Sequence, residues 1–96
     1  MRITFDSAKR DRTLAERGLD FARAAEIFDA SHLTQEDKRR GYGEKRCVTI
    51  GYLDGRMVVL VWTERFESRR VISLRKANER EQARYARIIS SLDLTR

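Results

Sequence analysis

The stretch RCVTIGYLDGRMVVLVWT, residues 46–63, reads as two β-strands and the turn that joins them. Residues 46–52 alternate between the two faces of a strand, and residues 57–63 are nearly all apolar, as in a central strand covered on both sides. Asp54-Gly55 between them is typical of a type I′ turn, which needs positive φ at both central positions. The stretch therefore predicts an antiparallel hairpin at the centre of a sheet.

A two-residue turn also fixes the register of this hairpin, because one slipped residue would exchange its two faces. The expected pairs are Leu53 with Arg56, Ile50 with Val59, Val48 with Val61, and Arg46 with Thr63.

Shorter patterns on both sides predict the remaining elements of one domain, residues 1–96. They are an edge strand at 3–5, helices at about 7–17 and 21–28, a short strand at 31–34, an exposed loop at 35–43, a strand at 69–75 and a helix from Asn78. Gly18 is suited to end the first helix, Asp20 to cap the second, and Asn78 with Glu81 to form a capping box. The order β-α-α-β-β-β-β-α predicts an α+β fold, an antiparallel sheet with two N-terminal helices and a C-terminal helix.

Composition limits the classes of function. The net charge of +6 favours an acidic partner such as nucleic acid or an acidic protein, although a soluble protein that happens to be basic is about as probable on charge alone. One cysteine and one histidine allow neither a disulfide within the chain nor a structural zinc site, so we expect no metal, no cofactor and a cytoplasmic location. We see no signal peptide and no apolar run long enough for a membrane.

Positive charge gathers in residues 65–87, which hold eight cations against three anions. The cations are Arg65, Arg69, Arg70, Arg75, Lys76, Arg80, Arg84 and Arg87. The last three are best explained as a solvated helix face with intrahelical Glu–Arg pairs. Arginine at strand ends suits phosphate, because the guanidinium fork matches phosphate oxygens.

Three arginines stand at the ends of apolar strands, where packing alone does not explain a cation: Arg46, Arg70 and Arg75. Glu44 would share a face with Arg46 in an extended segment, either as a structural ion pair or as a catalytic pair. Arg70 and Arg75 are an odd number of residues apart, so a regular strand would place them on opposite faces. A phosphate-binding role and a purely structural role remain open for all three.

The segments that carry these residues are FDSAKRDRTLAERGLDFARAAEIFD (5–29), YGEKR (42–46) followed by Gly51, and RRVISLRKANEREQARY (69–85). Together, in this order and spacing, they resemble the BrnT family of type II toxins. The resemblance implies a RelE-like fold, ribonuclease activity that blocks translation, and a small antitoxin, BrnA, whose ribbon-helix-helix end binds operator DNA. In that family the first helix commonly ends Lys-His-Gly, whereas this chain has Glu16-Arg17-Gly18. Arginine stabilises charge but is a poor general acid at neutral pH.

A ribonuclease without metal must align the 2′-OH with the phosphate, remove its proton, stabilise the phosphorane and protonate the leaving oxygen. We assign phosphorane stabilisation to Arg46, Arg70 and Arg75, and the base to Glu44. Lys9 or Arg17 would assist from the first helix. The expected RNA-binding residues are Tyr42, which would stack on a base or share the proton transfer, and Arg65, Arg69 and Lys76.

Two alternatives belong to other classes. A non-catalytic basic module would use the same arginines only to bind RNA or an acidic protein. The basic surface could also serve mainly to receive the antitoxin, which would then inhibit by covering it.

Overall fold

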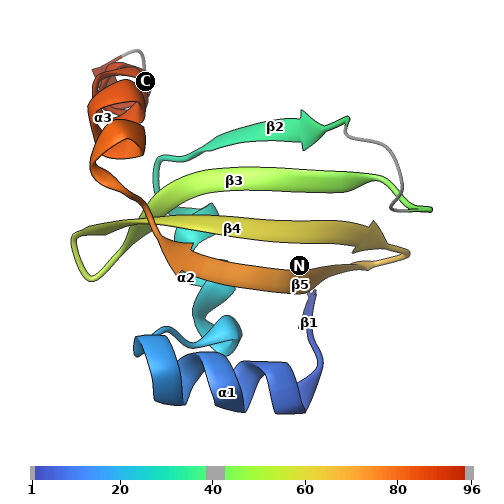
Figure 1. The fold of residues 1–96 in the computed structure, drawn as a ribbon. Coiled ribbons are helices and arrows are strands. Elements are labelled where there is room, and N and C mark those ends of the chain that lie inside the picture. Colours follow the sequence, from blue (N-terminus) through green and yellow to red (C-terminus); the bar gives the residue numbers. More distant parts are fainter. Residues whose placement is uncertain (1, 39–42, 95–96) are drawn as a thin grey trace.

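The computed structural model describes residues 2–38 and 43–94, which form one mixed five-stranded sheet with helices on both faces (Figure 1). The strands lie in the order β1-β5-β4-β3-β2, with every neighbouring pair antiparallel except β1 and β5. In chain order the elements are β1 (Arg2–Thr4), α1 (Ser7–Arg17), the 3₁₀ turn η1 (Phe21–Arg23), α2 (Ala24–Asp29), β2 (Leu33–Asp37), β3 (Arg46–Leu53), β4 (Arg56–Arg65), β5 (Ser68–Lys76) and α3 (Glu79–Leu94).

The predicted α+β class is confirmed, and three details of the prediction are wrong. The sheet is mixed because β1 runs parallel to β5, a pairing between distant segments that no local turn signal reveals. The second helical segment is divided into η1 and α2. Residues 35–37, predicted as loop, continue β2 and pair with β3, up to Asp37 opposite Arg46. This edge strand is polar and largely exposed, so its sequence resembles a loop.

The predicted ends of the first helix and the predicted hairpin turn are confirmed. Asp6 accepts hydrogen bonds from the backbone N–H groups of Ala8 (2.8 Å) and Lys9 (3.3 Å), and so begins α1. Gly18 ends that helix in the left-handed region, at φ 70°. The predicted hairpin forms in the predicted register, with Asp54 and Gly55 at φ 52° and 76°.

The two faces of the sheet have separate cores. On the first face, which we call the α2 face, Phe21, Ala24 and Ile27 are buried against alternate residues of β3, β4 and β5, among them Leu60. The opposite face is covered at one end by α3, through Ile89, and we call it the α3 face (Figure 1). The apolar stripe predicted for α3 is only partly covered. The other end of the α3 face carries the candidate site.

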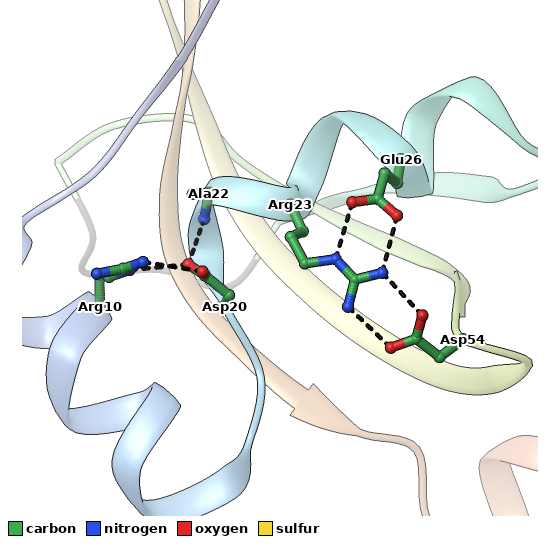
Figure 2. A network of polar contacts seen from close by, with 6 residues as sticks. All are labelled: Arg10, Asp20, Ala22, Arg23, Glu26 and Asp54. Atoms are coloured by element: carbon green, nitrogen blue, oxygen red, sulfur yellow. Dashed lines mark hydrogen bonds and ion pairs between the residues drawn. The ribbon is translucent and has the colours of Figure 1, made fainter.

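A surface network of ion pairs fastens the first helices to the sheet (Figure 2). Arg10 of α1 binds both carboxylate oxygens of Asp20, at 2.8 and 2.9 Å. Arg23 bridges Glu26 of α2 and Asp54 of the hairpin turn through four hydrogen bonds of 2.8 Å. Hydrogen bonds from the guanidinium groups lower the pKa of Asp20, Glu26 and Asp54. The network ties α1 to the residue that caps η1, and it ties the start of α2 to the hairpin turn between β3 and β4.

Gly51 of β3 lies where α2 comes closest to the sheet. A Cβ atom at this position would lie 2.6 Å from Cγ2 of Ile27, which is fully buried. The absence of a side chain therefore allows helix and strand to pack directly. This explains the glycine five residues after Arg46 as a packing requirement.

No helix in the described ranges 2–38 and 43–94 is long and apolar enough to span a membrane.

Candidate functional site

The arginines of β5 are positioned by a β-bulge. Val61 pairs with Ser73, whereas its neighbour Trp62 pairs with Val71, so Ile72 is an extra residue in β5. The strand is therefore shifted by one residue relative to a regular alternation. Arg70 and Arg75 consequently lie on the same face of the sheet, and the prediction of opposite faces is wrong.

That shared face is the α3 face, and Arg46 belongs to it as well. Thr63 pairs with Arg70, and the β3–β4 register places Arg46 opposite Thr63, one position beyond the pair of Cys47 with Trp62. Thr63 is buried and its hydroxyl donates to the carbonyl of Lys45 at 2.7 Å, which fixes the centre of this row. Two arginines thus lie on either side of a rigid, hydrogen-bonded threonine.

A hollow of about 500 Å³ lies beside the open edge of β5, between that edge and α1. β1 pairs only with residues 68–70 of β5, so among the described residues the edge of β5 that faces away from β4 has no neighbouring strand beyond Arg70. The hollow is lined by four cations and one carboxylate among its charged residues: Lys9, Arg12, Arg17, Arg46 and Glu16. Three sequence-predicted site residues, Lys9, Arg17 and Arg46, therefore meet here.

Sequence reasoning missed Arg12 and Ser73, which also line the hollow. Arg12 follows Lys9 by three residues, which places both on one face of a helix, and that spacing could have revealed it. Within the described ranges no ion pair neutralises Lys9, Arg12 or Arg70, whereas Arg10, Arg23, Arg65 and Arg75 are each bound to a carboxylate.

Arg17 has a structural task in addition to its place in the hollow. Its Nη1 donates to the carbonyl oxygen of Leu74 at 3.0 Å. Leu74 pairs with Leu60 of β4 on one side, and on its other side no described strand is paired with it, so Arg17 takes the place of a strand partner there. The last residue of α1 is thereby tied to the sheet.

Arg75 lies at the far end of β5 from Arg70 and is held by α3. Its two terminal nitrogens each donate to a carboxylate oxygen of Glu81, at 2.7 Å. Glu81 also accepts from the backbone N–H of Asn78 at 2.9 Å, and the Asn78 side chain accepts from the N–H of Glu81 at 2.8 Å. Hydrogen bonds from Arg75 lower the pKa of Glu81 to about 2. Arg75 therefore completes the capping box that begins α3.

Glu44 is bound to Arg65, with Nη2 donating to Oε2 at 2.8 Å. Arg65 follows Thr63 by two residues in β4, so this pair lies on the α3 face next to the row of Arg46 and Arg70. Glu44 lies in the bend before β3 and not in an extended segment, and its partner is Arg65, whereas the sequence suggested Arg46.

Three other predicted residues lie elsewhere. Arg69 is on the α2 face, where its guanidinium carbon lies 4.2 Å from the ring centroid of Phe28 and 4.7 Å from that of Trp62. Lys76 is exposed at the end of β5 and lines a different hollow, which lies between the β3–β4 hairpin and α3. Tyr42 lies outside the described residues.

In the described part of the chain, no three His, Cys, Asp or Glu side chains gather in a way that could hold a metal ion. The chemistry available here is that of cations beside a carboxylate on a rigid face. Guanidinium and ammonium groups bind phosphate, and they stabilise the extra negative charge of a phosphorane. Fold and site together define a small α+β protein with a cationic hollow suited to a nucleic-acid backbone.

Comparison with known families agrees with this class. The family model of the ribonuclease toxin BrnT of type II toxin-antitoxin systems matches residues 5–81, so the chain belongs to the BrnT family. A search of curated proteins found no significant sequence match. Membership in this family indicates an RNA substrate and an antitoxin partner.

Proposed function

We propose that this chain is a metal-independent endoribonuclease whose active site joins the row of Arg46 and Arg70 to the hollow beside α1. The observation that carries the proposal is the convergence of Lys9, Arg12 and Arg46 on one hollow, with no ion pair that neutralises Lys9 or Arg12 in the described structure. Such a concentration of cations is unfavourable within a folded protein unless an anion binds there.

In the proposed mechanism, the RNA supplies its own nucleophile. Arg46 and Arg70 hold the scissile phosphate and stabilise the phosphorane, whose charge exceeds that of the ground state. Glu44, oriented by Arg65, takes the proton of the 2′-OH. Lys9 gives a proton to the departing 5′-oxygen, because an ammonium group is a better acid than a guanidinium. The 2′-oxygen bonds to phosphorus as the bond to the 5′-oxygen breaks, which leaves a 2′,3′-cyclic phosphate and a 5′-hydroxyl.

Arg17 and Arg75 receive positioning roles in this proposal. Arg17 holds α1, and with it Lys9, against the edge of β5. Arg75 holds the start of α3 through Glu81. Of the three strand-end arginines that packing did not explain, only Arg46 and Arg70 then remain for direct contact with the phosphate.

The test is cleavage of end-labelled RNA by purified protein in excess chelator. We expect cyclic-phosphate products, and a loss of about 10²–10³ in rate for Arg46→Ala and for Arg70→Ala. Arg80→Ala is the matched control, because Arg80 is an exposed cation in the first turn of α3, away from the hollow. Full activity in folded Arg46→Ala and Arg70→Ala would refute the assignment. Retention of RNA without new ends would favour a non-catalytic binding module.

We further infer that the partner is a BrnA-like ribbon-helix-helix antitoxin. It would block translation arrest in the cytoplasm by covering the cationic hollow, and operator DNA would be bound only through the complex. The excess of four cations over one carboxylate in the hollow supports an acidic partner segment. Hydrogen exchange with and without the antitoxin tests whether it covers the hollow, and protection confined to the α2 face would exclude occlusion.

We also infer that the fold is RelE-like, which is supported by the consecutive antiparallel strands β2–β5 between helices.

A further inference from the structure

The turn between β4 and β5 carries an aromatic residue in an unfavourable position. Arg65 pairs with Ser68, so Phe66 and Glu67 form a two-residue hairpin turn. Phe66 has a φ of 38°, in the region that L-residues other than Asn and Asp rarely adopt. Glycine is the usual residue at the first central position of such turns when φ is positive there. The chain therefore retains a bulky side chain where a glycine would fit with less strain.

Within the described ranges, neither hydrophobic core cluster includes the Phe66 ring. Its exposure is 106%, whereas the other exposed large apolar residues, Leu14, Ile88 and Leu92, are only 36–43% exposed. Single exposed apolar residues need no explanation by themselves. A fully exposed ring on a strained backbone position is different, because it contributes neither packing nor turn stability, and strain of this kind is associated with function.

The surroundings of Phe66 are polar and carry both signs of charge. A shallow hollow of about 350 Å³ adjoins the ring and is lined by Arg2, Arg65, Glu67 and Ser68. The Ser68 hydroxyl donates to the carbonyl of Arg65 at 2.9 Å, which closes the turn, and Arg65 is fixed by Glu44. The ring is thus presented at a hydrogen-bonded turn, beside Arg2, a cation that no ion pair neutralises in the described ranges and that can bind a phosphate.

The turn also lies at the correct end of the sheet. Phe66 precedes Arg70 by four residues, and a strand rises roughly 3.3 Å per residue, so the turn lies about 13 Å from Arg70 along β5. Single-stranded nucleic acids are bound by proteins that combine a cationic track with aromatic rings, on which unpaired bases stack. An RNA strand held at Arg70 would reach Phe66 within a few nucleotides.

We propose that Phe66 is a stacking platform for an unpaired nucleobase of bound single-stranded RNA. The proposal deepens the proposed function and rests on it, because the RNA would be the strand held at Arg46 and Arg70. It specifies that this protein takes single-stranded substrate, since a base in a duplex cannot offer its face to the ring.

The test compares the affinities of Phe66 variants for a mixed-sequence RNA decamer with 2′-O-methyl riboses, which the enzyme cannot cleave. We expect Phe66→Ala and Phe66→Leu to bind roughly 5- to 150-fold more weakly, as base stacking on an aromatic ring predicts. Phe66→Trp should keep the wild-type affinity for the decamer, because an indole stacks on a base at least as well as a phenyl ring does. Ile88→Ala, which removes an exposed apolar side chain from α3, leaves it unchanged.

The outcomes separate the two proposals. If all Phe66 variants bind the decamer equally while the wild type cleaves RNA, the stacking platform is refuted and the proposed function stands. If Phe66→Ala binds RNA normally but loses the antitoxin, the ring belongs to a protein interface and the platform is again refuted. If the wild type neither binds nor cleaves RNA, both proposals fail. The change is confined to an exposed side chain, so we expect each variant to fold.

Discussion

Replacement of Glu81 by glutamine tests whether the Arg75–Glu81 contact holds α3 in place. Glutamine keeps an acceptor for the Asn78 N–H and the size of the side chain, but it removes the charge that Arg75 binds at 2.7 Å. The pKa of Glu81 falls from 4.5 to about 2, which would correspond to at most about 3 kcal/mol. Because the Arg75 side chain is 44% exposed, solvent screening reduces this value, and we expect about 1–2 kcal/mol.

The pH dependence has a definite sign. A carboxylate whose pKa is lower in the folded state stabilises the fold fully above its unfolded pKa, here 4.5. The contribution disappears as pH falls through the folded pKa of about 2. The difference in unfolding free energy between wild type and Glu81→Gln should therefore be constant from pH 8 to pH 5, and should shrink steadily between pH 5 and pH 2.

Urea unfolding at several pH values measures this difference directly. At pH 7 a loss of 1–2 kcal/mol corresponds to a Tm lower by about 4–8 °C for each kcal/mol in a domain of this size. Glu79→Gln is the matched control, since Glu79 is an exposed acidic residue in the same helical turn and binds no arginine in the described structure. An equal difference at pH 7 and pH 2.5, or none at pH 7, would refute the reasoning.

Two further substitutions test the packing and the turn. Gly51→Ala places a Cβ 2.6 Å from the buried Ile27 side chain, so we expect a loss of about 1–3 kcal/mol in urea unfolding, and an unchanged stability would show that α2 moves freely. Phe66→Gly relieves the positive φ of 38° and should stabilise the fold by about 0.5–1 kcal/mol while it weakens RNA binding; a lower Tm would contradict the assignment of strain to this turn.

Features that depend on neighbouring residues were predictable from the sequence. The Asp54-Gly55 turn, the register of β3 with β4, and the residues that begin and end α1 are determined by side chains within a few positions, and all were confirmed. The direction of β1 was not predictable, because its partner β5 lies more than sixty residues away and a three-residue strand carries no direction signal. The strand character of residues 35–37 was hidden for a similar reason, since β3 supplies their hydrogen bonds.

The site shows the same division between local and distant information. The sequence showed Arg46, Arg70 and Arg75 at strand ends, where packing does not explain a cation. The face of the sheet on which Arg70 and Arg75 lie depended on whether β5 was regular. The bulge depends on how β5 pairs with β4, and isoleucine is an ordinary strand residue, so nothing local marks Ile72 as an insertion. Regular alternation therefore predicted that Arg70 and Arg75 lie on opposite faces. The inserted residue brings both to the face that Arg46 occupies. What then distinguishes the two arginines is their partner rather than their face: Glu81 binds Arg75, whereas no ion pair holds Arg70 in the described part of the chain.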